Sequence, residues 1–189
     1  MLQFCFYSGL WADKRIVVFS VPFGNAGIDL LGENSLEIYA SNVWINLITM
    51  FLIISGGIGF IVWKDIMDGF KNHFIKGFSF KKCLQKLRLH TKITLVTTAI
   101  LIFGGALLIF LIEYTNSDTI GNMSFSGKII ASFFQSVTLR TAGFATFSQS
   151  GLRHGTVLLC YFLMIIGGSS IGTAGGIKTT TAATLFLST

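Results

Sequence analysis

The segment Ser136-Val-Thr-Leu-Arg-Thr-Ala-Gly-Phe144 decides the architecture of this chain, because a weaker copy of it occurs 116 positions earlier as Ser20-Val-Pro-Phe-Gly-Asn-Ala-Gly-Ile28. The two segments share the serine, the valine and the Ala-Gly pair at the same spacing. Each follows a short apolar segment and precedes a long uncharged run that contains Gly-Gly. The chain is therefore expected to consist of a repeated unit.

The residues around these two segments have the composition of a membrane protein. Of 189 residues, 52% are hydrophobic and 12% are charged, and the mean hydropathy is +0.71, which is too apolar for a soluble domain of this size. Residues 38–63 and 93–112 carry no charge, and each run is long enough to cross about 30 Å of hydrocarbon as a helix. A third apolar run, residues 155–177, ends in the glycine-rich segment 167–176. Because glycine costs about 1 kcal/mol in a helix interior, we expect a broken helix there.

The distribution of charge predicts the orientation in the membrane. Eight of the fourteen Lys and Arg residues lie between Lys64 and Lys92. The positive-inside rule makes this segment cytoplasmic, so both Ala-Gly segments belong to the outer side. The net charge of +6 thus reflects membrane topology, and no nucleic-acid partner is expected. Five acidic residues fall on the outer side, where they either raise the local cation concentration or form a solvated rim: Asp29, Glu33, Glu37, Glu113 and Asp118.

Two apolar segments that lead into the Ala-Gly motifs, residues 16–23 and 128–137, are too short to cross a bilayer. We expect short helices that enter the membrane and turn back. Irregular backbone at membrane depth persists only where protein buries it or where it lines a water-filled cavity. Gly27 and Gly143 can turn successive carbonyls to one side, and a column of carbonyl oxygens can replace the hydration shell of a potassium ion. The alternative is a tight turn or close helix packing, which two copies in matching contexts disfavour.

The glycine-rich segment Gly172-Thr-Ala-Gly-Gly-Ile-Lys-Thr179 superficially resembles a phosphate-binding loop. It has isoleucine directly before the lysine and follows a membrane run, whereas a phosphate-binding loop requires glycine there and a preceding soluble strand. We expect instead a loop between two half-helices, below the Ala-Gly segment, that could gate a pore. Lys178 has either a functional role or a snorkelling role. Arg140 is expected to anchor its loop by pairing with an acid or with backbone carbonyls.

The repeat continues into the long runs. Four apolar and glycine positions match at an offset of 111, with Leu52, Ile54, Gly56 and Gly57 corresponding to Leu163, Ile165, Gly167 and Gly168. The unit is then a short pore helix, a filter loop and an inner helix, with an outer helix before the second copy. The three cysteines, Cys5, Cys83 and Cys160, form no CxxC pair and predict neither a metal site nor a disulfide framework.

With these motifs the chain resembles the Trk/Ktr/HKT superfamily of potassium transporters, and specifically the bacterial Trk and Ktr ion-translocating membrane subunits. The resemblance covers nearly the whole chain. It rests on four segments: residues 134–144 resemble the third filter segment, residues 20–29 the second, residues 167–181 the glycine-rich intramembrane loop, and residues 89–92 the entry into the third repeat. The chain departs from the family pattern at Gly24, at Ile28 and at Ile171-Gly172.

The resemblance implies an all-α, multi-pass protein of the bacterial plasma membrane with a potassium-channel-like pore of four non-identical repeats, two of them partly present here. Residues 1–92 would comprise the end of the second repeat and a basic cytoplasmic connector, and residues 93–189 the third repeat. The selectivity filter would consist of Asn25, Ala26, Gly27 and Ile28 together with Thr141, Ala142, Gly143 and Phe144. The gate loop would be formed by Gly172, Thr173, Ala174, Gly175, Gly176 and Lys178.

The expected function is potassium uptake, with sodium as a second candidate ion, and without enzymatic activity, a bound cofactor or a resident metal. The resemblance also implies three partners: membrane lipid, a second copy of the full-length protein, and a cytosolic nucleotide-binding regulatory subunit. Two alternatives stay open at this point. One is a secondary transporter that carries an organic solute at its broken helix, and the other is an inactive truncated remnant.

Overall fold

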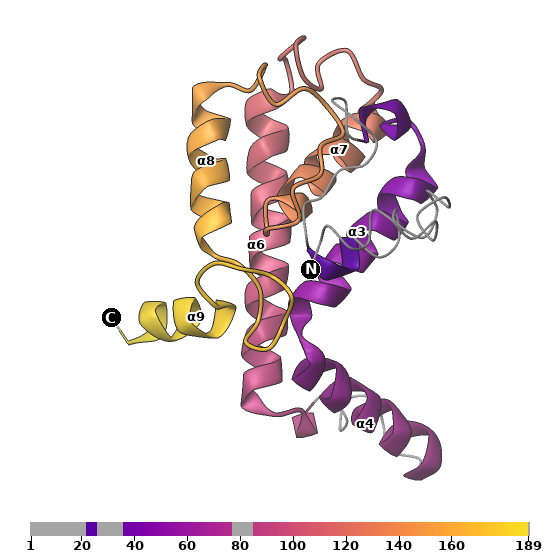
Figure 1. The fold of residues 1–189 in the computed structure, drawn as a ribbon, viewed down its shortest axis with the longest axis vertical. Coiled ribbons are helices and arrows are strands. Elements are labelled where there is room, and N and C mark those ends of the chain that lie inside the picture. The colour runs from indigo at the N-terminus through magenta and orange to yellow at the C-terminus, as the bar shows by residue number, and fades with distance from the viewer. Residues whose placement is uncertain (1–21, 26–35, 77–84, 189) are drawn as a thin grey trace, which may run out of the picture.

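The computed structural model describes residues 22–25, 36–76 and 85–188, and these residues form helices and loops without a β-strand. The long helix α6 stands at the centre, with α8 alongside it, α7 crossing it obliquely and α9 lying crosswise near its lower half (Figure 1). The elements are the short 3-10 helix η2 (Glu37–Tyr39) and the helices α3 (Val43–Ile58), α4 (Phe60–Lys76), α6 (Leu89–Glu113), α7 (Phe125–Thr138), α8 (His154–Ile165) and α9 (Thr179–Leu187). The all-α architecture expected from the sequence is confirmed.

Helix α6 has the surface of a membrane-spanning helix. It is the one helix in the described part of the chain that is long and apolar enough by itself to cross a bilayer. Its exposed face carries large apolar side chains at helical spacing, namely Val96, Ile100, Phe103, Leu107 and Leu111. Its buried residues include small and polar ones, Thr94, Thr98, Gly105 and Ala106. A soluble helix shows the reverse distribution, whereas small and hydroxyl residues at helix contacts are typical of proteins packed in lipid.

The uncharged run over residues 38–63 is not one straight helix, contrary to expectation. The chain bends by 101° between α3 and α4. The bend lies at Gly59, which has a φ of +89°, and a Cβ there would approach backbone atoms of residues 170–172 to 3.1 Å. Only glycine adopts this conformation without strain and leaves this space free. The inner helix of the first unit is therefore broken because a segment far along the chain packs against it.

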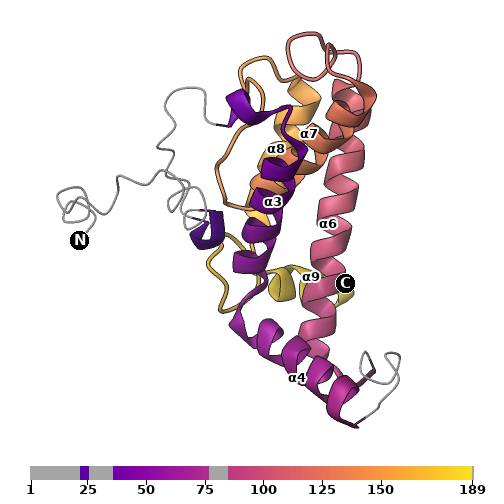
Figure 2. The same cartoon turned by 90° about the vertical axis from the view of Figure 1, so that its right-hand side faces the viewer.

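Helix α7 contains the short helix that the sequence predicted over residues 128–137. With 14 residues it is too short to cross a bilayer, and its N-cap is Ser124, whose Oγ accepts a hydrogen bond from the amide of Gly127. It packs against α6 and α3 (Figure 2). Near its end, Ser136 Oγ donates to the carbonyl of Ile102 in α6 over 2.9 Å. The other short segment, residues 16–23, lies mostly outside the described residues.

Glu113 closes the outer end of the fold. The side chain is fully buried, and its oxygens accept hydrogen bonds from the hydroxyls of Thr156 and Thr119, from the side-chain amide of Asn116 and from the backbone amide of Arg153. Arg153 and Thr156 belong to the start of α8, where a carboxylate is favoured by the helix dipole and the free amides.

The expected outer acidic rim is therefore wrong for Glu113, which faces neither solvent nor passing cations. Asp118 is exposed and Glu37 is half-buried. The remaining two, Asp29 and Glu33, lie outside the described residues.

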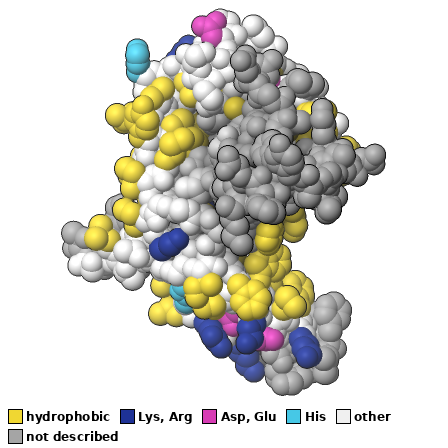
Figure 3. All heavy atoms as spheres, viewed as in Figure 1, with side chains coloured by type: hydrophobic (Ala, Val, Ile, Leu, Met, Phe, Trp, Pro, Cys, Tyr) yellow, Lys and Arg dark blue, Asp and Glu magenta, His cyan; other side chains and the backbone are white. Residues whose placement is uncertain are grey.

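Basic residues are concentrated at the opposite end of the molecule. On the face drawn in Figure 3, Lys and Arg side chains gather around α4 and the first turn of α6. There the carboxylate of Asp65 accepts a hydrogen bond from the backbone amide of Arg88 over 2.9 Å and lies 3.8 Å from its guanidinium. Because α6 begins at Leu89, its first turn precedes the division between repeats that the sequence predicts after residue 92.

Candidate filter and gate loop

The turn after α7, residues 141–144, has a backbone that alternates in conformation. Thr141 and Gly143 have positive φ angles of +73° and +81°, while Ala142 and Phe144 between and after them do not. The amides of this turn point back to the end of α7. The backbone amides of Ala142 and Gly143 donate to the carbonyl of Thr138 over 2.9 and 3.4 Å, and the amide of Phe144 donates to Thr138 Oγ1 over 2.8 Å. One threonine thus holds three consecutive amides.

The carbonyls of the same turn are left available. Thr138 Oγ1 donates to the carbonyl of Phe144 over 2.7 Å, but no described residue donates a hydrogen bond to the carbonyls of Thr141, Ala142 and Gly143. Backbone oxygens without a protein donor can coordinate a dehydrated potassium ion. Of the second expected filter segment the structure describes only Asn25, and Ala26, Gly27 and Ile28 lie outside the described residues.

The third apolar run is broken where the glycine content predicts it. Helix α8 ends at Ile165 and α9 begins at Thr179. The loop between them, residues 166–178, is closed at its base, since the amide of Gly167 donates to Ile177 O over 3.0 Å and the amide of Ile177 donates to Ile165 O over 2.8 Å. We refer to residues 166–178 as the gate loop, after the role that the sequence predicts for it. It contains all six residues that the sequence predicted for the gate.

The gate loop packs against the end of α3 through glycines. The amides of Ser169 and Thr173 donate to the carbonyls of Gly57 and Gly56 over 2.9 and 3.2 Å. A Cβ on Gly168 would lie 2.6 Å from Gly57 O, and one on Gly56 would lie 2.0 Å from Phe23 O. No larger residue fits at either position without displacing backbone. The Gly-Gly pairs that correspond in the sequence repeat therefore meet in space.

The gate loop also contacts both filter segments. Asn25 Nδ2 donates to Thr173 Oγ1 over 2.9 Å, and the amide of Gly175 donates to Thr141 Oγ1 over 3.1 Å. The structure thus brings together residues of the expected filter and the expected gate that are distant in sequence. We call these two hydrogen bonds the filter–gate contacts.

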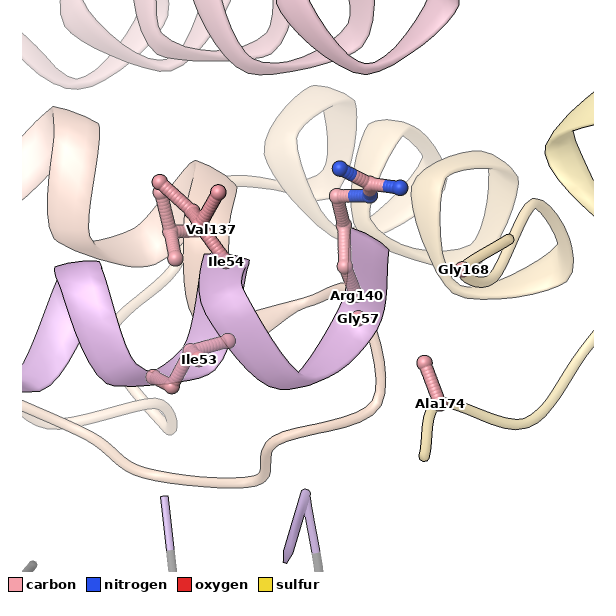
Figure 4. Close-up of a pocket in the computed structure, with 7 residues that line it drawn as sticks. All are labelled: Ile53, Ile54, Gly57, Val137, Arg140, Gly168 and Ala174. Atoms are coloured by element: carbon pink, nitrogen blue, oxygen red, sulfur yellow. The ribbon is translucent and has the colours of Figure 1, made fainter. Parts of the chain in front are cut away.

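Arg140 anchors the filter turn to the base of the gate loop. Its guanidinium is buried and donates to the carbonyl of Gly167 over 3.1 Å, which is one of the two pairings, with an acid or with backbone carbonyls, that the sequence predicted. It borders a small cavity of about 10 Å³ that is also lined by Val137, Gly57, Gly168 and Ala174 (Figure 4). A volume of that size holds about one water molecule. The Nε atom of Arg140 has no hydrogen-bond partner among the described residues.

Lys178 also contacts the gate loop. Its half-buried Nζ donates to the carbonyl of Ala174 over 3.0 Å. The residue precedes the first turn of α9, where the helix dipole disfavours a cation. The carbonyl of Ala174 offsets this disadvantage and ties the lysine to the loop.

The sequence did not predict the roles of two residues. One is Thr138, on which the conformation of the filter turn depends, and the other is Gly59, at the bend between α3 and α4. The signal for Thr138 was a threonine in the last turn of a short helix, where a hydroxyl can bond nearby backbone groups. Within the described residues, no group of three or more His, Cys, Asp or Glu side chains could hold a metal ion.

A short helix, a turn whose carbonyls accept no hydrogen bond from described residues and a broken helix packed against that turn give the described part of the chain an all-α, potassium-channel-like fold. The sequence profile of the TrkH family, described as a cation transport protein, matches residues 19–189, and the chain belongs to this family. Its members are integral proteins of the bacterial plasma membrane, which confirms the expected location.

Individual relatives agree with this assignment. The chain is 40% identical over 185 residues to the potassium/sodium uptake protein NtpJ of Enterococcus hirae, covering 98% of the chain and 38% of that protein. It is 40% identical over 179 residues to the Ktr system potassium uptake protein B of Bacillus subtilis, covering 95% of the chain and 37% of that protein.

Among solved structures, the potassium transporter TrkH from Vibrio parahaemolyticus matches with a TM-score of 0.65 and 22% identity, over 88% of the chain and 32% of that protein. At this identity the match shows the fold alone. The chain spans about a third of the length of each of these proteins.

Proposed function

We propose that the chain takes part in potassium uptake across the bacterial plasma membrane, with sodium as a second candidate ion. The observation that carries the proposal is the turn at residues 141–144, in which Thr138 holds the amides and the carbonyls of Thr141, Ala142 and Gly143 accept no hydrogen bond from described residues. Two relatives that match nearly the whole chain are named as a potassium/sodium uptake protein and a potassium uptake protein. These names support potassium as the ion.

In this proposal the ion passes between backbone oxygens, and the gate loop controls its passage. The filter consists of Thr141, Ala142, Gly143 and Phe144 together with Asn25, Ala26, Gly27 and Ile28. The gate consists of Gly172, Thr173, Ala174, Gly175, Gly176 and Lys178. Residues 1–92 then belong to one pore repeat and residues 93–189 to the next. The contacts of the gate loop with Asn25 and Thr141 support a gate directly beside the filter.

The proposed partners are membrane lipid, a second copy of the full-length protein and a cytosolic nucleotide-binding regulatory subunit. The apolar outer face of α6 supports the first of these. The relatives that are named as parts of a Ktr system support assembly with a further component.

The test is a graft into the Enterococcus hirae relative. The chain replaces the segment that it matches, and the graft is expressed in a bacterial strain that lacks its own potassium uptake. We expect growth at low potassium and uptake of rubidium in preference to sodium. Gly143→Ser should reduce this preference, because a side chain at a φ of +81° strains the turn and redirects a carbonyl.

Gly104→Ala is the control, since a Cβ at Gly104 meets nothing within 4 Å. An unchanged rubidium-to-sodium ratio in Gly143→Ser would contradict the proposed filter. Competition of an organic solute with rubidium flux would support the secondary transporter, and a folded but inactive graft would support the remnant.

A further inference from the structure

Each proposed filter segment holds the gate loop by one side chain. Thr141 Oγ1 accepts a hydrogen bond from the amide of Gly175, and Asn25 Nδ2 donates one to Thr173 Oγ1. The two filter–gate contacts reach positions only two residues apart in the loop. The loop is therefore attached to both filter segments at nearly the same place.

The filter residues that make these contacts have unusual backbones. Asn25 has a φ of +46° and Thr141 a φ of +73°. A β-branched residue adopts a positive φ only where its surroundings hold it. At Thr141 the hydrogen bond from Gly175 is one such restraint, and the amides held by Thr138 fix the residues that follow. Loss of the loop contact should therefore release the backbone whose carbonyls form the filter.

A potassium ion bound to the carbonyls of residues 141–143 would hold the same backbone conformation. Two interactions that stabilise one conformation strengthen each other, and the effect is reciprocal. We infer that Thr141 is a positioning residue that couples the filter to the gate loop, so that potassium in the filter favours the docked loop and the docked loop favours potassium in the filter. This inference rests on the proposed function.

Arg140 adds a restraint at the base of the same loop. Its guanidinium donates to Gly167 O, which precedes the part of the loop that Thr141 contacts. This contact holds the base of the loop, whereas Thr141 reaches the loop at Gly175. The coupling is assigned to the contact of Thr141, and Arg140 keeps the base of the loop in place when that contact is lost.

The reporter for loop docking is Ser169→Cys, in a background in which Cys5, Cys83 and Cys160 are replaced. Ser169 is fully buried in the gate loop, and the substitution exchanges one atom. A membrane-impermeant thiol reagent reaches the new thiol only when the loop moves away from α3. Ser132→Cys, which is 1% exposed in α7, is the control for accessibility outside the loop. Both are measured in inside-out vesicles that carry the graft described above.

Two substitutions at Thr141 separate the hydroxyl from the side-chain shape. Thr141→Val keeps the branched shape and removes the acceptor, whereas Thr141→Ser keeps the hydroxyl. We expect Thr141→Val to accelerate modification at position 169 about fivefold, as for one lost hydrogen bond, and Thr141→Ser to stay within about twofold. Replacing choline by potassium should slow modification in the parent and in Thr141→Ser but not in Thr141→Val. The rate at position 132 should not change.

Rubidium uptake, measured in the same preparations, distinguishes the possible failures. If the parent takes up rubidium but potassium does not change the modification rate at position 169, the coupling is wrong and the proposed function stands. If the parent takes up no rubidium, the proposed function fails. If, in addition, the modification rates at position 169 in choline are equal for Thr141→Val and the parent, the structural role of Thr141 is also overturned. Faster modification in Thr141→Val alone would support that role.

Discussion

At the scale of single residues, Glu113 shows how a carboxylate can be buried in this protein without a cationic side chain as partner. Each of its two oxygens accepts two hydrogen bonds, one pair from Asn116 and Thr119 and the other from Arg153 N and Thr156. All four donors are neutral groups. The residue joins the end of α6 to the start of α8 and fixes the loop between α6 and α7.

Glu113→Gln should therefore destabilise the protein although it preserves the size of the side chain. The amide nitrogen that replaces one oxygen faces two donors instead of accepting from them, and we expect a loss of about 2–4 kcal/mol in the free energy of unfolding. The unfolding midpoint of the detergent-solubilised protein is the measurement. Asp118→Asn, at an exposed position, should change stability by less than about 0.5 kcal/mol. Equal effects of the two substitutions would show that the hydrogen bonds of Glu113 are not stabilising.

The residues of the filter turn differ in how far the sequence determines them. The repeated Ala-Gly pair predicts Gly143 at a special backbone position, because glycine tolerates a positive φ. The positive φ of Thr141 was not predictable, since threonine disfavours it and the conformation depends on contacts with Gly175 and Thr138. Contacts of this kind join segments far apart in the chain and leave no local pattern.

At the scale of elements, the packing of α7 on α6 depends on one small residue. Gly105 in α6 faces Ser136 in α7, and a Cβ added to Gly105 would lie 2.5 Å from Ser136 Oγ and 2.9 Å from a methyl group of Leu163 in α8. Its neighbour Gly104 has nothing within 4 Å of the corresponding position. The two adjacent glycines thus have different environments on the same helix.

Gly105→Ala and Gly104→Ala form a matched pair of tests. Gly105→Ala should lower the free energy of unfolding by about 1–3 kcal/mol, because the added methyl group forces α7 and α8 away from α6. Gly104→Ala should be neutral or raise it by up to about 1 kcal/mol through better helix propensity. Thermal unfolding of the two variants under the same conditions decides between them. A larger loss in Gly104→Ala would contradict the close packing at Gly105.

The sequence determines most helices but not where one of them bends. The long uncharged runs and short apolar segments predicted α6, α7 and the break between α8 and α9, because these depend on local composition. The 101° bend at Gly59 was not predicted, since the three glycines at positions 56, 57 and 59 lie inside an uncharged apolar run that is long enough for one straight helix. It is the backbone of residues 170–172, packed close to Gly59, that excludes a side chain there.

At the scale of the whole molecule, the two ends differ in charge as membrane topology requires. Basic residues surround α4 and the start of α6, whereas the other end of α6 carries the acidic Glu113 and Asp118 together with the basic Lys128 and Arg153. Positively charged loops remain on the cytoplasmic side during insertion. We therefore expect the opposite loop, between α6 and α7, to be extracellular.

This orientation predicts which positions react from outside the cell. In the background without native cysteines, Asp118→Cys should react with an impermeant thiol reagent on intact cells. Lys71→Cys, at an exposed position of α4, should react only after the membrane is permeabilised. Labelling followed by gel shift is sufficient to measure both. The reverse pattern would mean that α4 is extracellular and that the loop between α6 and α7 is cytoplasmic, contrary to this prediction.

The meeting of Gly56-Gly57 with Gly167-Gly168 has a consequence for how the two repeats can diverge in evolution. A side chain on Gly168 would need the space of the Gly57 backbone, whereas a Cβ on Gly57 would meet other atoms only at 3.7 Å or more. A Cβ on Gly56 or Gly167 would instead collide with the backbone of Phe23 or of Gly175. After a duplication, Gly56, Gly167 and Gly168 would therefore each be retained for the sake of a neighbouring backbone segment, while Gly57 could be replaced by a small residue.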